Sequence, residues 1–355
     1  MTMLAEVVDA VIGIDTHRDS HEVEIADVTG KPVTTMQISN DSAGFAQLLS
    51  AIAEVAPGPR VAVSMEGSRS YGIGLARALA AAGLLVIECE QPSRKQRRGK
   101  GKSDPIDAHL AVLSALRLET GQLPVPRADG DREALRILLV ARQEITEART
   151  AQIGRLRALL LAGDDTDRQA ARKALTMTAL AALARRALGA DARREHAVRH
   201  GEIRRLALAL IQARHQLKDN HAQLQVIVDD VAPGLTSRFG VGAVSAAQAI
   251  VSFSHPGRCR NEAAFAALGG TSPLPASSGK TIRHRLNRGG DRDLNRAIHT
   301  IALTRMRSCP RTRAYFARRT AEGKTSREIR RCLKRYIARE LYRQLTQSMT
   351  PLISP

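Results

Sequence analysis

The chain has 355 residues and carries 54 Lys and Arg against 35 Asp and Glu, a formal charge of +19. Its length suggests two or three domains, and its 43% hydrophobic and 25% charged residues exclude wholesale disorder and a collagen-like fibre. The positive excess indicates a polyanionic partner, of which nucleic acid is the usual one, with a merely soluble basic protein as the alternative.

Strand and helix patterns alternate over residues 10–90. Apolar runs and polar–apolar alternation predict strands at 11–15, 21–28, 33–38, 61–65 and 84–89. Helical periodicity predicts helices at 42–55 and 74–82. Three strands, a helix, a strand, a helix and a strand make the order of an RNase H-like α/β fold, although many α/β folds share parts of that order.

The middle of the chain is predicted to be helical. A basic, glycine-bearing linker at 91–103 precedes a helix at 104–118, and residues 131–230 contain no proline. Within Glu202–Asp229, apolar residues recur at alternating steps of three and four, with Asn220 as a polar seam position that would fix register. The pattern favours a coiled coil that pairs two chains. The alternative is a helical hairpin packed within one chain.

The last third combines glycine turns with basic helices. Turns at 233–234 and 240–242 before a helix at 243–252 favour a helix-hairpin-helix element, which presents backbone amides to phosphates, although glycine turns between helices are common. Arginines are dense in the helices predicted over 291–346, which favours a phosphate-binding surface over a solvated face. We expect three domains, residues 1–130, 131–230 and 231–355.

Neither a membrane segment nor a disulfide framework is expected. No stretch reaches about 18 uncharged apolar residues, and the N-terminus lacks a basic leader. The four cysteines form no CxxC pair, which disfavours a zinc site and suits a reducing compartment. We expect a cytoplasmic, nucleoid-associated protein with no membrane partner.

Four carboxylates are candidates for chemistry. Asp15 ends a predicted strand in GIDTH, Glu66 ends another in VSMEGSRSYG, and Asp104 and Asp107 share one helix face in KSDPIDAH. In an RNase H-like sheet the strand ends can be adjacent, and clustered carboxylates call for a cation such as Mg²⁺. Two ions would polarise a phosphate. The alternative is structural: Asp104 before Pro105 also fits a helix N-cap.

A serine-glycine loop forms the second candidate site. Ser277 and Ser278 precede Gly279, and a serine becomes a good nucleophile only when a base or a metal activates it. Cations that would stabilise phosphoryl oxygens follow closely: Lys280, Arg283, Arg285 and Arg288. The alternative is a loop that contacts DNA without doing chemistry.

Together these motifs resemble the IS110 family of insertion-sequence transposases, which are bridge-RNA-guided recombinases with a RuvC-like N-terminal domain, a DEDD acid set and a serine-bearing C-terminal domain. The resemblance covers almost the whole chain. It is carried by GIDTH, SMEGSRSYG and KSDPIDAH, then by FAALGGTSP, SSG and RGGDRDLNRAI. The related Piv-type DNA invertases share this layout.

The resemblance implies roles for particular residues. Asp15, Glu66, Asp104 and Asp107 match the family's metal ligands, which implies one or two Mg²⁺ ions as cofactor. The family's nucleophilic serine lies five residues after the proline of its G-x-T-P motif and directly before glycine. The matching proline here is Pro273, which selects Ser278, with Ser277 as the fallback because the doublet makes the alignment ambiguous by one.

The resemblance also implies a reaction and its partners. Serine attack would leave a phosphoserine–DNA link, and strand exchange would join donor to target DNA without hydrolysis. The acids of one protomer would face the serine of another, in a homodimer that assembles to a tetramer. A non-coding bridge RNA would pair with donor and target DNA. Candidate backbone contacts are Arg94, Lys95, Arg97, Arg98, Lys100 and Lys102.

Two other functions stay open at this point. A junction resolvase would use the four acids and water, and Ser278 would then be structural. A nucleic-acid-binding protein without catalysis would need neither the acids nor the serine.

Overall fold

The computed structural model describes residues 2–89, 104–124, 126–188, 193–276, 284–285, 287 and 289–349. The N-terminal region holds a five-stranded sheet in the order β3-β2-β1-β4-β5. Its strands are β1 (Ala10–Thr16), β2 (Ser20–Asp27), β3 (Pro32–Ser39), β4 (Val61–Glu66) and β5 (Leu85–Cys89). β1 pairs antiparallel with β2 and parallel with β4, and β4 pairs parallel with β5. The predicted order of strands and helices is confirmed.

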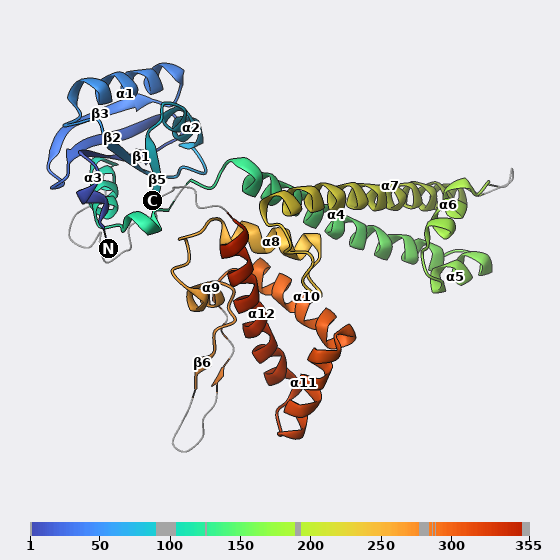
Figure 1. Ribbon diagram of the computed structural model, residues 1–355. Coiled ribbons are helices and arrows are strands. Elements are labelled where there is room, and N and C mark those ends of the chain that lie inside the picture. The colour runs from blue at the N-terminus through green and yellow to red at the C-terminus, as the bar shows by residue number, and fades with distance from the viewer. Residues whose placement is uncertain are drawn as a thin grey trace.

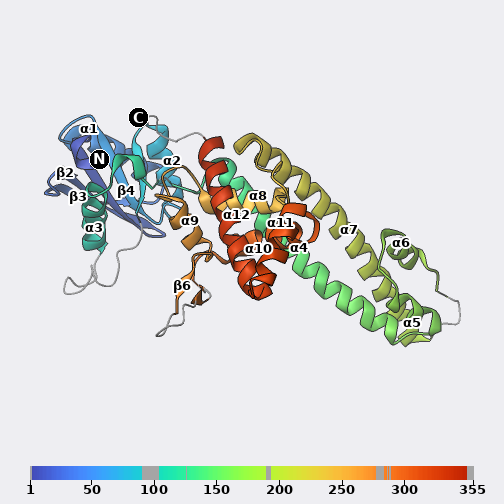
Figure 2. The same cartoon turned by 60° about the horizontal axis from the view of Figure 1, so that its bottom comes forward.

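Helices cover both faces of this sheet (Figures 1 and 2). On one face α1 (Ser42–Val55) and α2 (Ile73–Ala81) pack on a core that includes Ile12 and Ile14 of β1. On the other face α3 (Asp104–Leu116) packs on a core that includes Val11. Successive residues of a strand point to opposite faces, so β1 is buried on both sides, and this explains its nearly continuous apolar sequence. Two short 3₁₀ turns complete the region, η1 (Leu4–Glu6) and η2 (Thr120–Gln122).

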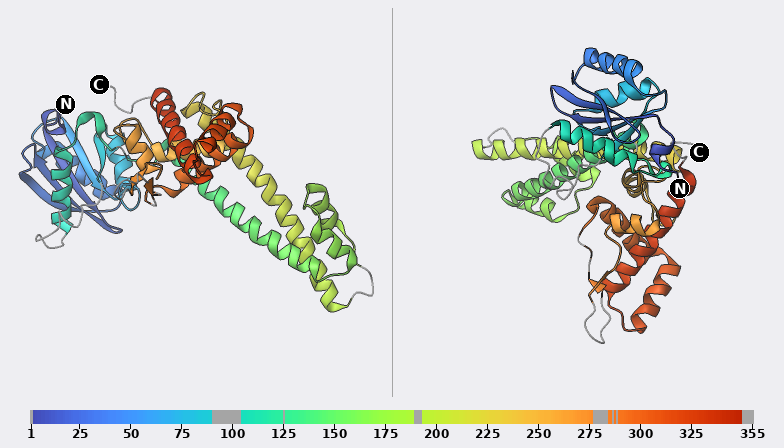
Figure 3. Two further views of the ribbon diagram at one scale, coloured as in Figure 1. Left: turned by 90° about the horizontal axis from the view of Figure 1, so that it is seen from below. Right: turned by 90° about the vertical axis from the view of Figure 1, so that its left-hand side faces the viewer.

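Two long helices form an arm that projects away from the rest of the molecule (Figure 3). They are α4 (Gly130–Leu161) and α7 (Arg194–Val231), and α5 (Asp165–Arg172) and α6 (Met177–Arg185) cap the tip. The tip has its own apolar core, which includes Leu160 of α4, Leu180 of α6 and Leu206 of α7.

The seam over Glu202–Asp229 packs within one chain, as the alternative of a helical hairpin predicts. These seam residues pack against α4, α5 and α6 of the same chain, and Leu206, Leu210 and Leu224 are buried there. The polar seam residue is also satisfied within the chain, because Asn220 Nδ2 donates to the Leu138 carbonyl oxygen at 2.9 Å. An intrachain hairpin therefore occupies the apolar face that a second chain would need.

The C-terminal region is mainly helical. It contains α8 (Ala243–Phe253), α9 (Glu262–Leu268), α10 (Arg292–Ser308), α11 (Pro310–Ala321) and α12 (Ser326–Ser348), with a minimal strand pair, β6 (Leu274–Pro275) and β7 (His284–Arg285). Phe253, Phe265 and Tyr342 meet in its core, with ring centroids 5.9–6.0 Å apart. The same core includes Leu135 of α4 and Leu224 of α7, so the base of the arm is packed into this region.

Turns connect α7 to α8 over residues 232–242, at the position of the predicted helix-hairpin-helix element. Its contact with phosphates stays a prediction. Across the described ranges, every helix is either too short or too polar to span a bilayer.

Candidate catalytic edge of the sheet

Asp15 and Glu66 lie side by side at the carboxyl ends of two parallel strands. β1 and β4 pair in register up to Ile14 and Met65, so the next residue on each strand is one of the two acids. Thr16 Oγ1 donates to the Glu66 carbonyl oxygen at 2.8 Å and joins the two strand ends. Asp15 is 8% exposed and Glu66 is half-buried. The predicted adjacency of these two acids is therefore seen.

Close packing of α3 on β1 brings Asp107 toward the same edge. A Cβ added to Gly13 would lie 2.0 Å from the Ala108 carbonyl oxygen, so the helix approaches the strand as closely as glycine permits. His109 Nδ1 also lies 2.7 Å from Glu24 Oε1 of β2. Asp107 is 7% exposed and immediately precedes Ala108, which places it on the sheet side of the first turn of α3.

Asp104 is the first residue of α3, and its side chain lies outside what the structure describes. The donor set at this edge is made of carboxylate oxygens, which suits Mg²⁺. Within the described ranges, however, no three Asp, Glu, His or Cys side chains lie close enough together to hold a metal ion. Asp15 Oδ2 instead lies 3.3 Å from His17 Nε2. Asp15 and Glu66 thus lie together at this edge, and Asp107 lies on the helix that packs on β1.

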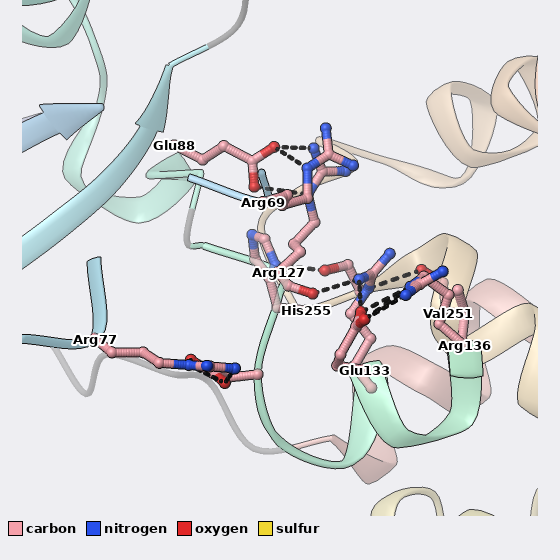
Figure 4. A network of polar contacts seen from close by, with 11 residues as sticks. Arg69, Arg77, Glu88, Arg127, Glu133, Arg136, Val251 and His255 are labelled. Carbon is pink, nitrogen blue, oxygen red and sulfur yellow. Dashed lines mark hydrogen bonds and ion pairs between the residues drawn. The ribbon is translucent and has the colours of Figure 1, made fainter. Parts of the chain in front are cut away.

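A polar pocket of about 550 Å³ adjoins Glu66, lined by Thr16, Glu66, Gly67, Ser68, Arg69, Ser70, Glu88 and Cys89. Glu88 is the last but one residue of β5, the strand next to β4, and is buried. Arg69 Nε lies 3.0 Å and Arg127 Nε 3.1 Å from its carboxylate (Figure 4). Burial alone raises the pKa of Glu88, but the hydrogen bond from Arg127 and the charges of both arginines outweigh it, so the pKa lies below its ordinary value.

The contacts of Glu88 and Arg127 continue into the C-terminal region. Arg132 Nε donates to the Val251 carbonyl oxygen of α8 at 3.2 Å, and its Nη1 donates to the Arg127 carbonyl oxygen. Burial and nearby arginines lower the pKa of Arg132 to about 10 and that of His255 to about 4. The edge that carries the acids is thus fastened to the end of α8.

The sequence prediction missed Glu88 and its arginines. Glu88 carries the same signal as Asp15 and Glu66, an acid at the end of an apolar strand. Arg127 lies in a proline-bearing connector that gave no such signal.

Most of the predicted serine site lies outside the described residues. This holds for Ser277, Ser278, Lys280, Arg283 and Arg288, and equally for Arg94, Lys95, Arg97, Arg98, Lys100 and Lys102. Arg285 is described: it is exposed on β7 and pairs with Leu274 of β6. The roles assigned to the others stay predictions.

Comparison with known proteins gives consistent matches. A family model described as "Transposase" matches residues 12–162, and one described as "Transposase IS116/IS110/IS902 family" matches residues 232–317. An uncharacterized 43.6 kDa protein of insertion element IS110 from Streptomyces coelicolor is 33% identical over 123 residues, which cover 34% of this chain and 30% of that protein. An uncharacterized 42 kDa protein of insertion element IS900 from Mycobacterium paratuberculosis is 25% identical over 362 residues, which cover 88% of this chain and 89% of that protein.

Proposed function

Because this chain belongs to the IS110 family of transposases, we propose that it is a site-specific DNA recombinase that cuts and rejoins donor and target DNA through a phosphoserine intermediate. The observation that carries the proposal is the placement of Asp15 and Glu66 on adjacent strand ends, with Asp107 on the helix packed over them. In this proposal residues 1–130 form a RuvC-like catalytic domain, residues 131–230 the arm, and residues 231–355 the serine-bearing domain.

Asp15, Glu66, Asp104 and Asp107 would hold one or two Mg²⁺ ions, whose positive charge lowers the cost of negative charge on a scissile phosphate. The chain's own contribution is to place the acids. Gly13 lets α3 lie directly on β1, and Thr16 joins the ends of β1 and β4. The folded chain therefore holds these strand ends in place before substrate binds, which reduces the entropic cost of assembling the site.

Ser278 would attack the phosphorus through Oγ. A Ser278–phosphate bond forms, the bond to the 3′ oxygen breaks, and the released 3′ oxygen takes a proton, leaving a free 3′-hydroxyl. Attack by the 3′-hydroxyl of the other DNA then reforms a phosphodiester and releases the serine. The covalent link conserves the energy of the phosphodiester, which hydrolysis by water would lose. Ser277 is the alternative nucleophile, because the two serines are adjacent.

The proposal includes a guide RNA and an oligomer. A bridge RNA would select donor and target by base pairing, so the protein would need mainly backbone contacts. Residues 91–103 and the loop around Lys280 and Arg283 supply cations for such contacts. A dimer that assembles to a tetramer would bring the acids of one chain to Ser278 of another. The seam of α7 is filled within the chain, so these contacts would use other surfaces.

The experiment incubates the purified full-length protein and its co-purifying RNA with element-junction DNA and Mg²⁺. We expect a denaturation-resistant protein–DNA adduct, mapped to Ser278 by mass spectrometry. Ser278→Ala and Asp15→Asn should each abolish the adduct, and Ser277→Ala is the matched control. Cleavage that persists in Ser278→Ala without any adduct would instead establish a resolvase that uses water. Binding with no cleavage in any metal would leave a non-catalytic nucleic-acid-binding protein.

A further inference from the structure

A cationic groove of about 680 Å³ lies between α10 and α12. Six of its lining side chains are basic: Arg292, Arg296, Arg327, Arg330, Arg331 and Lys334. None of its lining residues is acidic. Asp293, outside the lining, pairs with Arg296 at 2.7 Å. The lining itself therefore consists of basic and neutral side chains.

The basic residues follow one face of each helix. On α12 they recur at steps of three and four from Arg327 to Lys334, and on α10 the lining runs from Arg292 to His299. Such spacing keeps side chains on one face, and two helical turns extend about 11 Å. A single DNA strand rises about 3.4 Å per nucleotide, so the groove matches about three nucleotide steps.

The charges in the groove repel one another. Lys334 is half-buried and donates to Asn295 Oδ1 at 2.5 Å, a neutral partner. Burial, and then the charge of Arg292, lower the pKa of Lys334. Burial likewise lowers the pKa of His299, and the charges of Lys334 and Arg330 add to the effect. An anion in the groove would relieve this repulsion, and a concave surface lined by one sign of charge concentrates its field on such an anion.

The groove begins close to the proposed nucleophile along the chain. Arg292 is the first residue of α10, whose N-cap is Asp291, and α10 follows β7 in the chain. The loop between β6 and β7 contains Ser278. The groove and this loop are therefore neighbours along the chain.

We propose that the α10–α12 groove is a phosphodiester-binding site that holds about two or three consecutive phosphates of the nucleic acid on which the protein acts. The proposal rests on the proposed function and adds to it a surface that holds the nucleic acid. In this proposal the other basic residues of α10 and α11 are solvated charges that hold no phosphate.

The test compares two variants of the full-length chain that lose the same charge. The groove variant is Arg327→Ala/Arg330→Ala/Arg331→Ala. The control variant is Arg307→Ala/Arg311→Ala/Arg313→Ala, at exposed positions that do not line the groove. Fluorescence anisotropy gives the Kd for a labelled DNA duplex and an RNA duplex between 50 and 200 mM salt. Alanine favours helix, so α12 should be preserved. Lys334→Gln, which retains hydrogen-bonding capacity toward Asn295, is the second variant if the triple variant melts early.

For the groove variant we expect the slope of log affinity against log salt to fall in magnitude by about two, and affinity at low salt to fall roughly tenfold or more, with the control near wild type. A loss of affinity for DNA alone, for RNA alone or for both supports the site and identifies which nucleic acid it holds. Equal losses in groove and control variants, or no loss in the groove variant, would overturn the site while the proposed function stands. A wild-type protein that binds neither duplex would overturn both.

Discussion

Replacing Gly13 with alanine would force a methyl group between β1 and α3. Its Cβ would lie 2.0 Å from the Ala108 carbonyl oxygen and 2.8 Å from Val112 Cγ2, whereas real Cβ atoms essentially never approach closer than 3.0 Å. The helix must therefore move by about 1 Å in a core that is packed like a crystal. Overpacking of this kind costs about 1–3 kcal/mol. A shift of about 1 Å in a catalytic group can lower the rate about 100-fold. Because α3 carries Asp107, the rate of DNA cleavage by the variant should fall by more than the loss of stability explains.

The assay pairs thermal unfolding with DNA cleavage on Gly13→Ala. Gly201→Ala in α7 is the matched control, because nothing lies within 4 Å of its added Cβ and alanine favours a helix interior by about 1 kcal/mol. We expect the control to melt at or above the wild-type temperature and to cleave normally. A wild-type melting temperature for Gly13→Ala would refute the inferred contact between β1 and α3. Lower stability with full cleavage would show that the position of α3 does not govern the chemistry.

Three further predictions concern buried polar groups outside the set of four acids. Asn220→Leu deprives the Leu138 carbonyl of its donor and should lower the free energy of unfolding by about 1–3 kcal/mol in a urea titration; an unchanged midpoint would contradict it. Glu88→Gln leaves Arg127 without its counter-charge and should lower the free energy of unfolding by about 3–5 kcal/mol. A variant as stable as the wild type would show that the ion pair contributes nothing. Between its ordinary pKa of 6.5 and its folded pKa of about 4, His255 takes up a proton only when the chain unfolds. The free energy of unfolding of the wild type should therefore fall by about 2 kcal/mol more between pH 7 and pH 5 than that of His255→Asn. Equal pH dependence in both proteins would show that His255 is not held neutral.

Two strands of the N-terminal sheet, β1 and β4, were predictable because they are buried on both faces. β1 and β4 then read as apolar runs with an acid at the end, and this pattern located both the strands and two of the candidate site residues. Since parallel strands end at the same edge, the adjacency of Asp15 and Glu66 followed from the predicted order.

Other features depend on contacts that no local pattern records. A heptad pattern shows that α7 needs a partner helix, but it does not say whether that partner belongs to the same chain. Here it is α4, and the Asn220 contact with Leu138 fixes the pair. The bond between Glu88 and Arg127 likewise requires the connector after η2 to fold back onto β5, as the Glu88 backbone amide shows by donating to the Pro124 carbonyl oxygen.

The arm of α4 and α7 acts mechanically as a lever with a fixed base. Arg132, in the first turns of α4, is bonded to Val251, and the base of the arm shares the C-terminal core, so both helices are clamped at one end. The 32 residues of α4 extend about 48 Å at 1.5 Å per residue. A tilt of about 5° at the clamp would therefore carry the tip through roughly 4 Å, given that length. Conversely, a force applied at α5 and α6 produces a torque at the base that grows with the length of the arm. Arg132 at that base donates to the Arg127 carbonyl oxygen, and Arg127 in turn binds Glu88.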